Sequence, residues 1–162
     1  MGGTRANSTV SLVSPDSPRL WDAARRMVEE YAASLKIDLG FQDFAQEVEG
    51  LPVEYGPPSG YFLLASVENV LVGCGAFRSL SASDCEMKRL YVAPAGRGRR
   101  VGFTVASALI EEARRLGYAR MLLDTLPSMA RAQALYASLG FRPTAPYRFN
   151  PVPGASFLAL QL

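Results

Sequence analysis

The chain has 162 residues, of which 49% are hydrophobic, and its 17 Lys and Arg against 15 Asp and Glu give a formal net charge of +2. This length and hydrophobic content are enough for one globular domain with a real core, which we expect to span residues 1–162. The charge is too small to indicate nucleic-acid binding, and there is no histidine, which excludes a Ser-His-Asp triad, a Cys-His pair and a His-ligated metal site.

Hydrophobic periodicity predicts the first elements of the chain. An alternating strand over Ser8–Val13 precedes a helix from about Arg19 to Lys36, which has an apolar face, and a shorter helix over Phe41–Glu49. The stretch Leu51–Gly60 contains three prolines and two glycines. We therefore expect it to be a loop.

The middle of the chain reads as strands followed by a helix. Tyr61–Val67 and Val70–Leu80 are two strand-like runs joined by the tight turn Glu68-Asn69, which predicts an antiparallel hairpin. Glu86–Val92 alternates and is rich in strand-forming residues. The apolar residues of Val101–Leu116 then repeat at helical spacing.

The last third continues this strand and helix with a second strand over Ala119–Asp124, and the length of the unit suits a right-handed parallel crossover. Ser128 is expected to cap a helix that runs to about Leu139. A less regular, proline-containing segment leads to a final strand over Ser156–Leu162. The order β-α-α-β-β-β-α-β-α-β-β predicts an α/β fold with a mixed (α+β) sheet, antiparallel in its N-terminal half.

The run Glu86–Gly102 joins a strand to a helix through a Gly/Arg loop. The unpaired N–H groups at the start of that helix form a ready anion site. Arg99 and Arg100 lie at this positive helix end, where a cation is unfavourable unless an anion such as phosphate binds. The glycines that would let the backbone approach that anion closely are Gly96, Gly98 and Gly102.

This segment matches neither of two familiar phosphate-binding loops in full. A Walker P-loop fails because no Gly-Lys-Ser/Thr ends it. A dinucleotide fingerprint comes closer: Gly96 and Gly98 open it and Asp124 stands where a ribose-binding acid is expected. Its third glycine, however, is at Gly102, while Val101 fills the usual position. The preceding strands also do not alternate with helices.

Two motifs together resemble the GNAT superfamily of N-acyltransferases. The first runs from Leu90-Tyr-Val-Ala-Pro through Arg97–Gly102, and the second is Ala134–Phe141. In that family the first segment ends a splayed strand and forms the acyl-CoA pyrophosphate loop, and the second bears a tyrosine beside the CoA sulfur. This sequence departs from the family pattern at Arg100, where a glycine is usual, and at Met129, where many relatives have Asn. We expect a backbone at Arg100 that a residue with a Cβ tolerates.

The resemblance implies transfer of an acetyl group from acetyl-CoA, as co-substrate, to an amine by direct attack in a ternary complex, without a metal. The CoA arm would pair with backbone groups of a strand, whose side chains we expect to belong to the core or the walls. The residues implied in CoA binding are Leu90, Tyr91, Val92, Arg97, Gly98, Arg99, Arg100, Val101, Gly102, Phe103 and Thr104.

Tyr136 and Glu86 are the catalytic candidates that the resemblance implies. Tyr136 would protonate the departing thiolate, and its alternative is an ordinary buried aromatic residue. Glu86 would take the amine proton, directly or through water, and its alternative is a surface carboxylate paired with Lys88 or Arg89. Strand alternation puts Glu86 on the same face as Lys88 and Leu90, unless a bulge intervenes.

The acceptor is a small-molecule or peptide amine that the sequence does not identify. The segment Ile37–Phe77 has acidic residues and no Lys or Arg, so it would suit a cationic amine or form an ordinary solvated face. Tyr147–Gly154 is expected to form one wall of the acceptor pocket. A module that binds acyl-CoA without turnover stays open as an alternative, and so does a homodimer.

Membrane, metal and nucleic-acid partners are not expected. No apolar stretch is long enough to cross a bilayer, and residues 1–6 lack the apolar core of a signal peptide. Cys74 and Cys85 have neither metal-ligand spacing nor a disulfide framework. The arginine loop lacks the interleaved aromatic residues of a nucleic-acid site. The default is a cytoplasmic protein.

Overall fold

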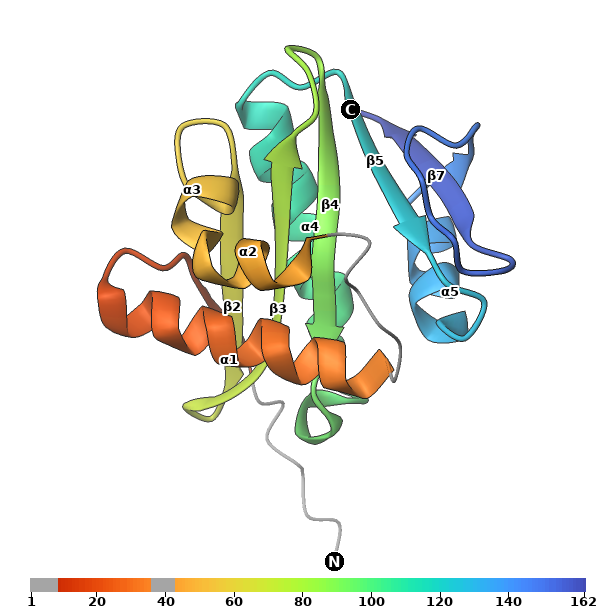
Figure 1. Ribbon diagram of the computed structural model, residues 1–162. Helices are drawn as coiled ribbons and strands as arrows, with labels where there is room; N and C mark the ends of the chain where they lie inside the picture. Colours follow the sequence, from red (N-terminus) through yellow and green to blue (C-terminus); the bar gives the residue numbers. More distant parts are fainter. Residues whose placement is uncertain (1–8, 36–42) are drawn as a thin grey trace, which may run out of the picture.

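The computed structural model describes residues 9–35 and 43–162 (Figure 1). Its centre is a mixed sheet of seven strands in the order β1-β2-β3-β4-β5-β7-β6. The strands are β1 (Val10–Val13), β2 (Tyr61–Val67), β3 (Val70–Ser79), β4 (Asp84–Val92), β5 (Arg120–Thr125), β6 (Arg142–Pro143) and β7 (Ser156–Gln161). The helices described are α1 (Pro18–Leu35), α2 (Phe44–Glu49), α3 (Leu51–Tyr55), the short 3₁₀ helix η2 (Pro94–Gly96), α4 (Val101–Arg115) and α5 (Ala130–Ser138).

The predicted mixed sheet is confirmed. Strands β1 to β4 pair antiparallel, β4 and β5 form the parallel pair, and β5, β7 and β6 are antiparallel. The expected hairpin turn is also present, because Glu68 and Asn69 have φ values of 51° and 65°. Positive φ at both central residues is the backbone that a tight two-residue hairpin needs.

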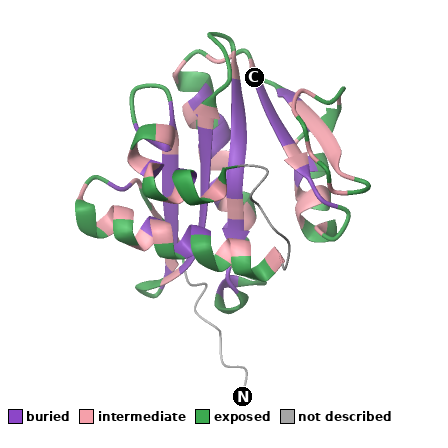
Figure 2. Cartoon of the chain, in the orientation of Figure 1, coloured by how far each residue is buried: buried purple, intermediate pink, exposed green. Residues whose placement is uncertain are grey.

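Two hydrophobic cores lie on the two faces of the sheet (Figures 1 and 2). Helices α1, α2 and α3 cover one face, where α1 residues such as Val28 pack against sheet residues such as Phe62. Helix α4 covers the other face and contributes residues such as Leu109 to a core that also includes Tyr136 of α5. The central strands are therefore buried on both sides.

The sheet opens between its two parallel strands. Strands β4 and β5 pair only at Asp84↔Arg120, Cys85↔Met121 and Glu86↔Leu122, and then diverge (Figure 1). Within the described ranges, the later part of β4 has no register partner on β5. Its backbone groups on that side are thus left for another partner, as the family resemblance implies for a splayed strand.

Strand β4 also contains a bulge. Ala76 pairs with Lys88 and Cys74 with Tyr91, so Gly75 alone stands opposite Arg89 and Leu90. Arg89 takes the left-handed φ of 60° that such an extra residue often needs. The bulge moves Leu90 to the α4 face, whereas Glu86 faces the α1–α3 side. The exception allowed for a bulge therefore applies, and Glu86 and Leu90 lie on opposite faces of the sheet.

Two further expectations about the elements need correction. The Leu51–Gly60 stretch is not entirely loop, because Leu51–Tyr55 form α3. Its proline is in the first helical turn, where the missing N–H costs no hydrogen bond. Ser128 does not cap α5, whose N-cap is Met129 and has no side-chain cap bond. The outer parts of the predicted Ser8–Val13, Arg19–Lys36 and Phe41–Glu49 elements lie outside the described residues.

Candidate active site

The loop from β4 to α4 exposes four consecutive residues at a helix start. Residues 97–100 are all exposed, and the first helical bond runs from the Thr104 N–H to the Arg100 carbonyl, at 3.0 Å. Helix geometry leaves the N–H groups of the three residues before Thr104 without helical acceptors. Gly98, with φ of 78°, lets the chain turn into this start. The loop thus presents donors and cationic side chains to the same side of the fold.

Arg100 has a strained backbone. It is the N-cap residue of α4, with φ of 59° and ψ of 28°, the left-handed region in which glycine is favoured. A residue with a Cβ is tolerated in this conformation, as expected, but at an energetic cost, and that strain explains why glycine is usual at this family position. The Arg100 guanidinium lies 4.3 Å from the centre of the Phe103 ring. This cation–π contact offsets part of the strain.

The three loop glycines have different roles. A Cβ on Gly96 would come within 2.8 Å of the Val72 side chain, so Gly96 is needed for packing against β3. A Cβ on Gly102 would make only ordinary contacts, 3.4 Å from Leu135 and 3.5 Å from Val92. The sequence argument that all three serve the approach of an anion therefore applies best to Gly98.

The side chains of the implied CoA strand belong to the cores, as expected. Tyr91 packs on the α1 side, where its hydroxyl donates to Glu30 Oε1 at 3.2 Å. Leu90 and Val92 pack on the α4 side. The Thr104 hydroxyl donates to the Arg100 carbonyl at 2.8 Å, so its proton is directed to the helix rather than outward.

The loop, the opened strand and the tyrosine helix meet at one place. The position of Gly102 lies next to Val92 on β4 and next to Leu135 on α5, and Leu135 directly precedes Tyr136. Tyr136 is 7% exposed, and its ring packs edge-on against Phe141 at 5.7 Å. The start of α4 and the tyrosine helix, which are separated by about thirty residues of sequence, are thus brought together.

Burial raises the pKa of Tyr136 above its ordinary value, and Tyr31 and Asp124 add to the rise. The phenol is consequently protonated at neutral pH, as a proton donor must be. It is also a weaker acid than a free phenol, so the mismatch with a thiol is larger than the modest one expected from the sequence. Proton donation from Tyr136 then depends on its position beside a developing thiolate charge.

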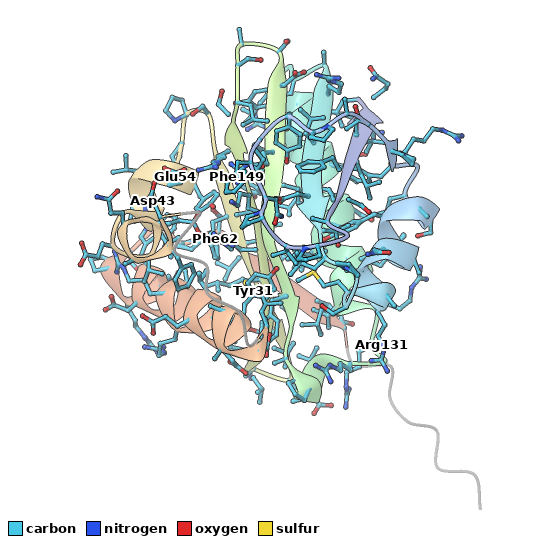
Figure 3. All side chains as sticks on the ribbon, turned by 45° about the vertical axis from the view of Figure 1, so that its right-hand side comes forward. Tyr31, Asp43, Glu54, Phe62, Arg131 and Phe149 are labelled. Atoms are coloured by element: carbon cyan, nitrogen blue, oxygen red, sulfur yellow. The ribbon has the colours of Figure 1, made fainter. Side chains whose placement is uncertain are left out.

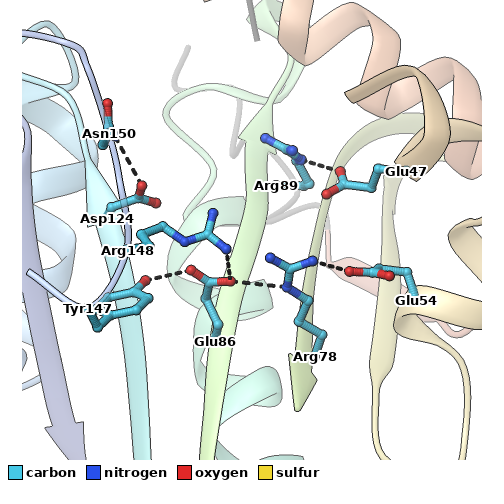
Figure 4. Close-up of polar contacts among 9 residues, drawn as sticks. All are labelled: Glu47, Glu54, Arg78, Glu86, Arg89, Asp124, Tyr147, Arg148 and Asn150. Atoms are coloured by element: carbon cyan, nitrogen blue, oxygen red, sulfur yellow. Dashed lines mark hydrogen bonds and ion pairs between the residues drawn. The ribbon is translucent and has the colours of Figure 1, made fainter. Parts of the chain in front are cut away.

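Glu86 is fully buried and is held by three donors (Figure 4). Its Oε1 accepts from Arg78 Nε at 3.1 Å and from Arg148 Nη2 at 3.1 Å, and its Oε2 accepts from the Tyr147 hydroxyl at 2.6 Å. The alternative of a surface carboxylate is therefore wrong. Burial, and after it the Glu86 charge, raises the pKa of Tyr147, which keeps this donor protonated.

The basic neighbours of Glu86 in the sequence are also buried. Arg89 pairs with Glu47 of α2 at 2.5 Å, and only 3% and 4% of these side chains are exposed. Burial, followed by the charge of Arg89, lowers the pKa of Lys88 to about 8. The acidic and basic stretches of the sequence thus meet inside the fold, between α2 and the bulge of β4.

The segment between β6 and β7 is attached to both diverging strands. Tyr147 and Arg148 bind Glu86 of β4, and the Asn150 side-chain amide donates to Asp124 Oδ2 of β5 at 3.0 Å. Asp124, considered above as a ribose-binding acid, thus anchors this segment. In the described part of the chain, no group of three or more His, Cys, Asp or Glu side chains is arranged to hold a metal ion.

A pocket of about 570 Å³ lies between this segment and α2–α3. Figure 3 shows Glu54 of α3 and Phe149 of the β6–β7 segment close together. The pocket is lined by Asp43, Gln46, Glu47, Gly50, Val53, Glu54, Arg78, Arg148 and Phe149. Part of the predicted wall, Tyr147–Gly154, therefore does line a pocket.

Sequence reasoning missed Arg78 and the way Tyr147 and Arg148 hold Glu86. Arg78 is the first basic residue after the acidic stretch Ile37–Phe77, and this change of charge along a predicted strand was the available signal. Nothing local marks Arg148 as a partner of Glu86, because 62 residues separate them.

The chain is similar to known acetyltransferases in sequence and in fold. The acetyltransferase (GNAT) family profile matches residues 21–141. An uncharacterized N-acetyltransferase of Schizosaccharomyces pombe is 36% identical over 157 residues, covering 96% of each chain. An acetyltransferase from Streptococcus agalactiae superposes with a TM-score of 0.78 at 20% identity, covering 94% of this chain and 98% of that one.

A third match was solved with a ligand. The Salmonella typhimurium protein yncA, whose structure contains its cofactor acetyl-CoA, superposes with a TM-score of 0.66 at 22% identity and covers 94% of this chain and 93% of its own. At this identity the likeness establishes the fold. The profile match over most of the chain and the identity to the yeast relative establish the family. The chain belongs to the acetyltransferase (GNAT) family and is an N-acyltransferase.

Proposed function

We propose that this protein transfers the acetyl group of acetyl-CoA to an amine by direct attack in a ternary complex. The observation that supports this best is the meeting of the helix start at Gly102, the opened strand at Val92 and the Tyr136 helix at Leu135. These are the segments that a CoA pyrophosphate, its pantetheine arm and its sulfur would require. The acetyl-CoA bound to the similarly folded yncA protein supports the choice of co-substrate.

The loop supplies what the phosphates of CoA need. The free N–H groups at the start of α4 and the positive end of its dipole favour an anion. Arg97, Arg99 and Arg100 add charge, while Val101, Gly102, Phe103 and Thr104 form the first helical turn. An anion bound here would offset the unfavourable placement of arginines at a positive helix end.

The later part of β4 would bind the pantetheine arm. The two amides of that arm can pair with the backbone of Leu90–Val92 on the side that β5 leaves open. A backbone N–H near Leu90 or Val92 would then donate to the carbonyl oxygen of the thioester as it becomes an oxyanion. Because the three side chains pack in the cores, the strand can hold this ligand without rearranging.

Two residues would handle the protons. The acceptor amine loses one proton as its nitrogen bonds to the acetyl carbon, and we assign that proton to Glu86, directly or through water. A carboxylate has about four lone-pair sites, and the three donors on Glu86 leave one for it. The C–S bond breaks as the tetrahedral adduct collapses, and Tyr136 protonates the departing thiolate.

A turnover screen tests the proposal. Purified protein is incubated with acetyl-CoA and a broad panel of amines, free CoA is measured over time, and N-acetylated products are identified by mass spectrometry. We expect acceptor-dependent CoA release together with an acetylated amine. Tight binding of acetyl-CoA without turnover on any amine would instead favour the non-catalytic acyl-CoA-binding module.

The organisation and location of the chain are part of the same proposal. Residues 1–162 would form one N-acetyltransferase domain acting on a small-molecule or peptide amine, in the cytoplasm. Within the described ranges, none of the helices has the length and apolar character needed to cross a membrane. Cys74 and Cys85 are free and buried, and burial raises the pKa of each thiol to about 12.

A further inference from the structure

The pocket beside Glu86 has cationic groups at one end and carboxylates on its α2–α3 wall. Arg78 and Arg148 both line it, and both donate to the single buried carboxylate of Glu86. Arg78 also pairs with Glu54. Two guanidinium groups therefore share one oxygen of Glu86, and only Arg78 has a second carboxylate in this network (Figure 4).

Two of the three carboxylates that line the pocket, Glu47 and Glu54, are paired with protein cations. Burial alone would raise the pKa of Glu47, but its hydrogen bond and charge interaction with Arg89 lower it on balance. Glu54 is held by Arg78. A cationic acceptor would have to compete with these arginines for Glu47 and Glu54, whereas Asp43, the third carboxylate of the lining, is exposed. The two paired carboxylates of the acidic stretch are thus weak sites for a cationic amine in the fold.

Arg148 retains unused hydrogen-bonding capacity. Its Nη2 donates to Glu86, while its Nε is buried with no hydrogen-bond partner in the described structure. A guanidinium has five N–H donors in a planar fork that matches a carboxylate. A buried donor without a partner costs free energy. A ligand that supplies an acceptor to Arg148 would remove this cost after a small adjustment of the Arg148 side chain.

The exposed part of the same pocket carries two large apolar side chains beside the polar Asp43 and Gln46. Val53 and Phe149 are 90% and 74% exposed, and both line the pocket. Large hydrophobic side chains with this exposure are expected to contact an apolar group of a ligand. The pocket therefore combines arginines at one end with two exposed apolar side chains at its entrance.

We infer that the acceptor is a small amine that also carries a carboxylate and an apolar group, the chemistry of an apolar amino acid. Arg148, assisted by Arg78, holds the acceptor carboxylate, and Val53 and Phe149 contact its apolar group. This inference rests on the proposed acetyl transfer and adds the substrate class. It places the acceptor amine on the Glu86 side of the opened strands.

Matched acceptors test the inference. Acetyl-CoA turnover is measured with apolar amino acids such as phenylalanine and leucine, with their amides, and with phenethylamine, which lacks the carboxylate. The amide has the less basic amine, so its larger free-amine fraction alone would favour the amide. We expect kcat/KM to be about 10- to 100-fold higher for the acids. Equal or higher values for the amides or for phenethylamine would overturn the inference.

Variants assign the selectivity to Arg148. Arg148→Gln removes a partner of Glu86 and should therefore slow turnover of the amides too, but it should lower kcat/KM for the acids about 10- to 100-fold more than for the amides. Arg148→Lys should fall between the two proteins. The control variant Arg131→Gln removes one exposed cation from α5, away from the pocket (Figure 3). It should change kcat/KM neither for the acids nor for the amides. A loss in Arg148→Gln that is equal for acids and amides would mean that Arg148 only supports the segment, contrary to the inference.

Binding of acetyl-CoA, followed by calorimetry without any acceptor, separates this inference from the proposed function. If acetyl-CoA binds but only acceptors without a carboxylate are acetylated, the substrate class is wrong and the proposed function stands. If acetyl-CoA binds and none of the amino acids is acetylated, the substrate class is again wrong. If acetyl-CoA does not bind, the proposed function itself fails.

Discussion

The Tyr147 hydroxyl donates to the buried carboxylate of Glu86 at 2.6 Å, joining the β6–β7 segment to the strand that would hold the thioester. Arg148 makes a second link to the same carboxylate. Glu86 therefore has two separable tasks: it anchors one wall of the acceptor pocket, and it accepts the amine proton in the proposed mechanism. The two tasks respond differently to pH.

Glu86→Gln should reveal both tasks. Leaving two guanidinium groups around a neutral amide should lower the free energy of unfolding by about 2–3 kcal/mol, measured by urea denaturation. If Glu86 accepts the amine proton, the loss in kcat/KM should be greatest below the acceptor's own pKa, about 10²-fold, and should shrink as free amine becomes abundant at higher pH. A loss that is the same at every pH would leave Glu86 with the anchoring task alone.

Tyr136→Phe isolates the proposed proton donor, because it retains the ring packed against Phe141 and removes only the hydroxyl. We expect kcat to fall about 10²-fold while the affinity for acetyl-CoA stays within twofold. Since burial raises the pKa of Tyr136, the hydroxyl remains protonated up to about pH 10. The wild-type kcat profile should accordingly have no descending limb from this group between pH 6 and 10. Unchanged turnover, where chemistry limits the rate, would remove Tyr136 from the mechanism.

A pair of loop variants tests the left-handed backbone at Arg100. Arg100→Gly should be more stable than Arg100→Ala by about 1 kcal/mol, because alanine retains the left-handed strain. The matched control is Gly102→Ala, at a helical position where a Cβ meets only ordinary contacts. There alanine should be the more stable residue, by about 0.5–1 kcal/mol. Thermal unfolding of the three variants and the unmodified protein measures both differences in stability. Equal stability of the two Arg100 variants would contradict the left-handed backbone at this position.

Lys88 should give the stability a characteristic pH dependence. Its folded-state pKa of about 8 lies below the ordinary value of 10.5, so the folded protein binds fewer protons than the unfolded chain between these values. The contribution of Lys88 therefore makes the free energy of unfolding rise with pH between the two pKa values. The cost of burying its charge is greatest below pH 8. Lys88→Met should raise the free energy of unfolding by about 2–3 kcal/mol at pH 7. The gain should decline by pH 9.5, and a gain independent of pH would contradict the lowered pKa.

Much of the fold could be predicted because the signals are local. The Glu68-Asn69 turn, the periodic helix Val101–Leu116 and the Gly/Arg loop each contain their own evidence in a few residues. The short helix Leu51–Tyr55 was missed because prolines and glycines around it indicate a loop, whereas packing of Leu51 and Tyr55 against α1 and the sheet stabilises a single helical segment.

The site was only partly predictable because its key contacts are long-range. The loop and Tyr136 were found from motifs, but the burial of Glu86 depends on Arg78 and Arg148, which no local pattern connects to it. The bulge at Arg89 could be anticipated only as an exception to strand alternation. Burial of charged residues is set by which elements fold over the strand, and that is a property of the tertiary structure.

The central claim is that acetyl-CoA binds at the start of α4, and the most direct test is a calorimetric titration of the unmodified protein and Arg97→Glu with acetyl-CoA and with NAD. The matched control is Arg114→Glu, which makes the same charge change in the last turn of α4, at the opposite end of the helix. We predict that acetyl-CoA binds the unmodified protein more tightly than NAD, that Arg97→Glu weakens acetyl-CoA binding at least tenfold, about 1.4 kcal/mol, and that Arg114→Glu changes it less than twofold. Tighter binding of NAD, or equal acetyl-CoA affinity in all three proteins, would contradict the account.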